Sequence, residues 1–151
     1  MKFRLISRVL GIGLIAFSFL QLTPIIVSII YSEDNIAAFA YSFLITLAFG
    51  SFLYLVNFER KYEGIRVKEG FLLTVLLWLF FTIFATLPLM FGTKTGLTIV
   101  SAYFEATSGL TTTGATIFSD LSGEYYSILF YRGLLQWIGG LGIIVLAIAL
   151  M

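Results

Sequence analysis

The sequence predicts an all-α integral membrane protein, with two leading transmembrane helices and then one unit in which a re-entrant loop joins two further helices. Hydrophobic residues form 60% of the 151 residues and charged residues only 11%, whereas soluble domains carry about 45–50% and about 25%. Mean hydropathy is +1.04. Four segments are long and apolar enough to cross a bilayer, which takes about 20 residues. A polar stretch rich in threonine and glycine separates the last two segments.

The four candidate spans are residues 9–30, 36–58, 70–91 and 133–151. Helix is the expected form, because the strands of a membrane barrel alternate in polarity and these segments do not. Pro24 predicts a kink in the first span, and the third span is expected to end around Pro88. A cleaved signal peptide is the alternative for the first span, but its apolar stretch exceeds the roughly 7–15 residues of such signals. We therefore divide the chain into a leading helix pair, residues 1–61, and a second unit, residues 65–151.

Positive residues predict the orientation, since the cytoplasmic loops of membrane proteins are enriched in lysine and arginine. Three precede the first span and four lie between the second and third, whereas the link at residues 32–35 carries only negative charge. The two basic sets are Lys2, Arg4 and Arg8, and then Arg60, Lys61, Arg66 and Lys68. We therefore expect a cytoplasmic N-terminus. Residues 92–132 then start from the external side, where Lys94 and Arg132 are the exceptions to the rule.

Residues 97–119 fit neither a membrane span nor a solvated loop, because they carry Glu105 and a threonine-glycine run among apolar residues. A re-entrant hairpin is one solution, in which a short helix at residues 97–109 enters from outside and an extended segment at 110–117 returns. The other is an amphipathic helix that lies in the membrane interface and is followed by a loop. Periodicity alone does not separate the two.

The run Thr-Thr-Thr-Gly-Ala-Thr at residues 111–116 suits a dehydrated cation. Backbone carbonyls are strong dipoles without net charge, and rings of them replace the hydration shell of potassium in channel filters. Carbonyls that all point one way require an unusual backbone conformation, which Gly114 tolerates. The helix before the run would direct its negative C-terminal end toward the cation. Irregular backbone at membrane depth also has to be buried in protein or line a water-filled cavity.

Two carboxylates flank this run, and each has two interpretations. Both could make the outer mouth of the pore attractive to cations. Alternatively, Glu105 is a buried hydrogen-bonding partner and Glu124 is a solvated surface charge. Arg132 either caps the membrane interface or pairs with one of them. The glycine cluster at residues 139–142 lacks the strand and spacing of a nucleotide-binding loop. Like Gly11, Gly13 and Gly50, it predicts close packing of helices.

Composition excludes several function classes. The chain contains no cysteine and no histidine, which removes disulfides, imidazole zinc sites and Ser-His-Asp triads. We therefore expect no enzyme. The net charge of +1 indicates no nucleic-acid partner.

Three stretches carry a resemblance to a known family. They read Phe-Glu-Ala-Thr-Ser-Gly-Leu-Thr-Thr-Thr-Gly-Ala-Thr at residues 104–116, Ile-Leu-Phe-Tyr-Arg at 128–132 and Gln-Trp-Ile-Gly-Gly-Leu-Gly-Ile at 136–143. Together they resemble the Trk/Ktr/HKT superfamily of potassium transporters. The two leading spans make the resemblance closest to the Trk branch, and it covers essentially the whole chain.

This resemblance implies both a fold and a function. Family members contain four consecutive helix–pore loop–helix units around one pore, of which this chain would supply the first unit and the leading pair. Glycine at the filter position favours potassium, because serine there accompanies sodium permeation in part of the plant branch. The tyrosine-glycine ending of true potassium channels is missing, so the outer ion sites should be fewer or looser. The residues that match the potassium-coordinating filter are Thr111, Thr112, Thr113, Gly114 and Ala115.

The resemblance also implies surroundings and partners. It predicts a subunit of a potassium uptake permease in the bacterial inner membrane, surrounded by lipid and homodimeric when full length. A cytoplasmic nucleotide-binding regulatory ring of the TrkA type would bind it. The nucleotide belongs to that ring, so no cofactor is expected here, and transported K+ is the ligand. Whether uptake is a symport with protons or is driven by voltage alone stays open.

The chain is shorter than the resemblance implies, because family members have four pore units and this chain would supply one. One unit provides only a quarter of a coordination ring. The last span also ends in apolar residues without a basic anchor. We therefore favour a fragment with a truncated last helix over a short chain that must assemble. Two alternatives to the transporter subunit remain, namely a non-conducting assembly or regulatory subunit and a tetrameric cation channel of four short chains.

Overall fold

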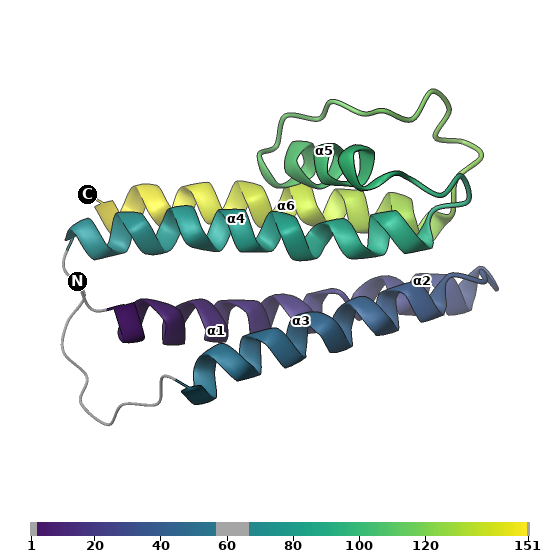
Figure 1. Ribbon diagram of the computed structural model, residues 1–151. Coiled ribbons are helices and arrows are strands. Elements are labelled where there is room, and N and C mark those ends of the chain that lie inside the picture. The colour runs from purple at the N-terminus through teal and green to yellow at the C-terminus, as the bar shows by residue number, and fades with distance from the viewer. Residues whose placement is uncertain (1–2, 57–66, 151) are drawn as a thin grey trace.

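The structure is a computed structural model that describes residues 3–56 and 67–150, and every regular element in these ranges is a helix (Figure 1). One layer holds α1, α2 and α3, and the other holds α4, α6 and the short α5. The bounds are α1 Phe3–Leu20, α2 Thr23–Ile30, α3 Ile36–Val56, α4 Val67–Gly92, α5 Ile99–Leu110 and α6 Tyr126–Leu150. The predicted all-α class is confirmed.

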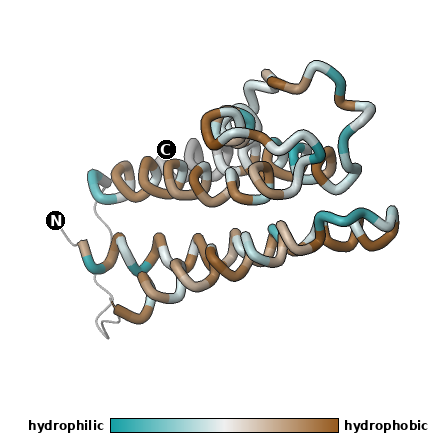
Figure 2. The backbone as a smooth tube through the Cα atoms, turned by 45° about the vertical axis from the view of Figure 1, so that its right-hand side comes forward, coloured by the Kyte–Doolittle hydropathy of each residue, from teal (hydrophilic) through white to brown (hydrophobic). Residues whose placement is uncertain are grey.

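Three stretches of the described residues are long and apolar enough to cross a membrane, namely Phe3–Ile30, Ile36–Val56 and Lys68–Gly92. They correspond to the first three predicted spans, and Figure 2 shows the apolar residues along them. α6 has 25 residues and is therefore about 37 Å long, against about 30 Å for the hydrocarbon core of a bilayer. It begins at Tyr126, ahead of the predicted start at residue 133.

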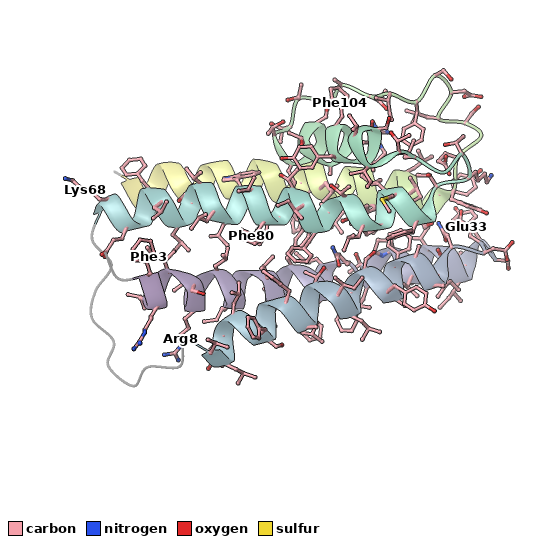
Figure 3. All side chains as sticks on the ribbon, in the orientation of Figure 1. Phe3, Arg8, Glu33, Lys68, Phe80 and Phe104 are labelled. Atoms are coloured by element: carbon pink, nitrogen blue, oxygen red, sulfur yellow. The ribbon has the colours of Figure 1, made fainter. Side chains whose placement is uncertain are left out.

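The long helices run side by side, so the molecule has two ends (Figure 1). We call one the link end; it holds residues 31–35, the last turn of α4 and the first turns of α5 and α6. The opposite tail end holds the first turns of α1 and α4, with Arg8 and Lys68 (Figure 3). The rest of the predicted basic loop, with Arg60, Lys61 and Arg66, lies outside the described residues, as does the predicted boundary at residues 61–65.

α1 and α3 cross at two glycines. A Cβ built at Gly11 would lie 2.7 Å from the Gly50 carbonyl oxygen, and a Cβ at Gly50 would lie 3.0 Å from the Gly11 carbonyl oxygen. Gly13 similarly faces the Leu77 side chain of α4. Small residues let membrane helices approach this closely, which matters because lipid is as apolar as the helices and supplies no hydrophobic drive. The predicted packing role of these glycines is confirmed.

α4 continues through Pro88 instead of ending around it. Proline has no amide hydrogen, so the Phe84 carbonyl one turn earlier loses its helical donor. Gln21 replaces that donor, with its Nε2 at 3.1 Å from the Phe84 oxygen, while Thr46 Oγ1 donates to Gln21 Oε1 at 3.1 Å. Gln21 is fully buried and lies in the break between α1 and α2, which is the kink predicted at Pro24. The leading helices thus satisfy a backbone group of α4.

We predict that Gln21→Leu lowers the free energy of unfolding in detergent by about 1–2 kcal/mol, because the Phe84 carbonyl then has no donor in apolar surroundings. The matched background is Pro88→Ala, which returns an amide hydrogen to that carbonyl. In this background Gln21→Leu should cost clearly less. Denaturant or thermal unfolding measures both, and an equal cost in the two backgrounds would show that Gln21 does not serve the carbonyl freed by proline.

Candidate ion-coordinating loop

α5 and the segment after it form a hairpin that enters and leaves at the link end (Figure 1). Thr98 is the N-cap of α5, and its hydroxyl accepts a hydrogen bond from the Ser101 amide at 3.3 Å. The helix runs toward the middle of α4 and α6 and ends at Leu110. The chain then returns as irregular backbone to Tyr126. The re-entrant hairpin is therefore confirmed over the interfacial helix, with bounds one or two residues later than predicted because Thr98 caps the helix.

The C-terminal end of α5 lies directly on α6. A Cβ built at Gly139 would overlap the Leu110 carbonyl, and a Cβ at Gly109 would lie 3.1 Å from the Leu135 Cβ. Leu110 is fully buried. Close backbone contact therefore requires glycine at position 139, as predicted for packing. The same contact determines where the returning segment starts, and the negative end of the α5 dipole faces that start.

The backbone amides of the threonine-glycine run are directed at the end of α5. Each amide from residue 111 to 114 donates to a carbonyl in the last turn of the helix. The bonds, at 2.9 to 3.5 Å, run from Thr111 to Thr107, from Thr112 to Gly109, and from Thr113 and Gly114 to Ser108. They satisfy carbonyls that have no partner within the helix itself.

The carbonyls of the run consequently face away from α5. In a trans peptide the carbonyl points opposite to the amide hydrogen of the next residue, and none of the described peptide bonds is cis. Because the amides of residues 112–114 face the helix, the carbonyls of Thr111, Thr112 and Thr113 face outward. Within the described ranges no donor reaches these three oxygens or that of Gly114. Residues 111–117 are all exposed, so the loop presents a row of carbonyl dipoles on an open face.

Two left-handed residues shape this row. Gly114 has a φ of 77° and Thr112 a φ of 56°. No atom lies within 4 Å of a Cβ built at Gly114, so backbone conformation rather than crowding favours glycine there, as predicted. The sequence places Thr112 in the predicted filter but does not predict its left-handed conformation, because an L-residue adopts that conformation only at a cost of about 1–2 kcal/mol.

Ala115 differs from the other four residues predicted to coordinate potassium. Its carbonyl accepts a hydrogen bond from the Ser108 hydroxyl at 2.6 Å and is therefore turned toward α5. Ser108 is buried, and it holds the loop both through this hydroxyl and through its own carbonyl. Sequence reasoning misses Ser108, although a hydroxyl among the small residues at the end of the helix was the available signal. Coordination of potassium by these five residues stays a prediction. The carbonyl oxygens of residues 111–114 have no hydrogen-bond donor among the described residues and are available for it.

Glu105 holds the returning arm of the hairpin. Its carboxylate is buried and accepts hydrogen bonds from the Thr116 hydroxyl at 3.0 Å and the Ile117 amide at 3.1 Å. Arg132 of α6 donates its Nε–H to the same carboxylate at 2.5 Å, and its guanidinium lies 5.6 Å from the centre of the Phe118 ring. Of the interpretations left open above, the structure supports Glu105 as a buried partner and pairs Arg132 with it.

Glu124 is also buried, which corrects its interpretation as a solvated surface charge. Its carboxylate accepts hydrogen bonds from the amides of Lys94 at 2.8 Å and Tyr125 at 3.1 Å. The Lys94 ammonium in turn donates to the Gly123 carbonyl at 2.8 Å. These bonds join the turn before α5 to the start of α6. Both carboxylates are thus engaged by protein donors, and a cation at the open face would meet neutral dipoles.

Comparison with known proteins places these features in one family. The chain matches the family TrkH, described as a cation transport protein, over residues 35–151. It is 44% identical to the Trk system potassium uptake protein TrkH of Escherichia coli K12 over 100% of this chain and 31% of that protein. The Trk system potassium uptake protein TrkG of the same strain is 35% identical over 98% of this chain and 30% of its own length.

A solved structure shows the same architecture. The crystal structure of the potassium transporter TrkH from Vibrio parahaemolyticus matches with a TM-score of 0.92 and 38% identity, over 99% of this chain and 32% of that one. The chain therefore spans about a third of the length of the relatives that it matches. The predicted resemblance to the Trk branch is confirmed.

We predict that Arg132→Met destabilises the protein by about 3–5 kcal/mol, because it leaves the Glu105 carboxylate buried and unpaired. Adding Glu105→Gln should recover most of this loss, since glutamine still accepts from Thr116 and Ile117. Thermal unfolding in detergent measures both variants. Lys94→Met is the control, because it removes an exposed cation whose bond is at the surface. Equal small losses for Arg132→Met and Lys94→Met would contradict the buried pairing.

Proposed function

This chain belongs to the TrkH family of cation transport proteins, and from that premise we propose that it forms the first pore unit of a potassium uptake transporter. In this proposal the carbonyls of residues 111–114 replace water around a dehydrated K+ as it crosses the membrane. The observation that carries the proposal is the row of outward carbonyls that no donor in the described ranges reaches.

The energetics of the membrane interior support this role. A backbone carbonyl without a partner at membrane depth costs several kcal/mol, so such groups normally line water or bind a ligand. A potassium ion supplies the missing positive partner to several carbonyls at once. Because the carbonyls carry no net charge, the ion is bound without being trapped. The end of the α5 dipole adds a further attraction to cations.

One loop contributes only part of a coordination shell. We propose that further pore units of the same or other chains complete the ring, which agrees with the exposure of residues 111–117. The outer face of α5 is exposed as well, at Tyr103 and Phe104. Phe104 points away from the other helices (Figure 3), and this face would meet the further pore units or lipid. A homodimer and a nucleotide-binding regulatory ring are proposed on the family resemblance alone. We also propose that the chain divides at residues 61–65 into the leading helix pair and the first pore unit.

The charge distribution supports an orientation. The chain is a membrane protein of the bacterial Trk type, and we propose the inner membrane as its location. Arg8 and Lys68 lie at the tail end, whereas Glu33 lies at the link end (Figure 3). Since positive residues are retained in the cytoplasm, we propose that the tail end, where α1 begins, faces the cytoplasm. The hairpin then opens to the outside.

We predict that Gly114→Ser lowers discrimination of potassium over sodium by about tenfold. A side chain at this φ costs about 1–2 kcal/mol, which the loop relieves by turning its carbonyls, and about 1.4 kcal/mol corresponds to tenfold in an equilibrium. The test uses a chimaera in which this chain replaces the matching part of E. coli TrkH, in cells without other potassium uptake. Potassium-limited growth and inhibition of uptake by sodium are measured.

Gly96→Ser is the matched control. Gly96 also has a positive φ, 63°, and also has no atom within 4 Å of a built Cβ, but it lies in the turn before α5. It should leave discrimination unchanged. If Gly114→Ser, like the control, changes only the amount of protein in the membrane, the result contradicts the filter role and favours a non-conducting scaffold. A chimaera that fails to restore growth even without substitutions also contradicts the proposal.

A further inference from the structure

The first turn of α6 is capped by a residue of the link between α2 and α3. Glu33 follows α2 (Figure 3), and its carboxylate accepts hydrogen bonds from the amides of Tyr126 at 2.6 Å and Ser127 at 3.2 Å. Its exposure is 9%. The first amides of a helix have no partner within the helix, and a negative charge at that end is favoured by the helix dipole. A residue of the leading pair therefore supplies a cap that local sequence does not.

Asn35 joins three helices at the same place. Its Nδ2 donates to the Gly92 carbonyl, the last of α4, at 3.1 Å and to the Ser127 hydroxyl of α6 at 2.8 Å. Its Oδ1 accepts from the Ser28 hydroxyl of α2 at 2.5 Å. Asn35 is 6% exposed. The amide thus fixes the distance between the two long helices of the second unit at the end where the hairpin enters and leaves.

These contacts lead directly to the coordinating loop. Arg132 lies less than two turns after the capped amides, on the same helix. It holds the Glu105 carboxylate, and that carboxylate holds Thr116 and Ile117 of the returning arm. A change in the position of the first turns of α6 would therefore move the arm that carries the carbonyl row. The connection consists of charged or buried hydrogen bonds at each step, which leave little freedom.

We propose that Glu33 and Asn35 are positioning residues for ion selectivity. The link between the leading helices sets the place of α6 and, through Arg132 and Glu105, the place of the carbonyls at residues 111–114. The leading pair, which contributes no residue to the carbonyl row, then acts on selectivity from the link end. This inference rests on the proposed potassium function of the loop.

The test measures selectivity in the E. coli TrkH chimaera that carries this chain. Loss of a helix cap by Glu33→Ala should lower discrimination of potassium over sodium by about three- to tenfold. Asp34→Ala is the matched control, because Asp34 is the exposed acidic neighbour in the same link, and it should leave discrimination unchanged. Glu33→Gln, which keeps one acceptor oxygen, should give an intermediate value and serves if Glu33→Ala does not reach the membrane.

A rescue separates positioning from general damage. Tyr125 directly precedes α6, so Tyr125→Ser offers a local N-cap and should restore discrimination to the Glu33→Ala chimaera. The inference is overturned if the Glu33 variants discriminate normally and change only the amount of protein in the membrane. That outcome leaves the potassium function intact, whereas failure of the unsubstituted chimaera to take up potassium contradicts the proposed function itself.

Discussion

Main chain that leaves helical form at membrane depth has to satisfy both its amides and its carbonyls without bulk water. Residues 111–114 separate these two tasks. Their amides donate to carbonyls in the last turn of α5, and the carbonyls of Thr111, Thr112 and Thr113, which share peptide planes with the amides of residues 112–114, face the other way. Because the planes are rigid, satisfying one set of groups orients the other. The open carbonyls need a partner from outside the described residues, and a dehydrated cation is the partner whose charge suits them.

The other contacts of the hairpin hold this arrangement in one place. Leu110 lies on Gly139, which sets the depth of the turn. Glu105 and Arg132 join the helix, the returning arm and α6 in one buried ion pair. Such pairs add little net stability, but breaking one partner is costly, so they can select a single geometry. Glu33, which follows α2, caps α6 and so links the leading helices to the helices that hold the hairpin.

Apolar length and the distribution of charge are enough to predict the long helices, whereas the mixed polarity of residues 97–119 leaves two predictions, a re-entrant hairpin and an interfacial helix. Gly114 is predictable because few other residues accept its conformation. The roles of Ser108, Thr112 and Glu33 cannot be predicted from the sequence, because each depends on which backbone groups the fold brings close to that residue. Glu33 meets an amide 93 residues later in the chain, and no local pattern records such a pairing. Glu124 is misjudged for the same reason, because burial by a distant turn is invisible in its neighbours.

The central claim is that main-chain oxygens of residues 111–114, and not side chains, hold the ion. Crystals of the assembled transporter grown in rubidium, whose anomalous scattering locates the ion, test this most directly. Rubidium density in front of these carbonyls, with the Ala115 carbonyl still bound to Ser108, is the predicted result. Density held by the Glu105 or Glu124 carboxylates, or a loop whose carbonyls all bond to protein donors, would contradict it.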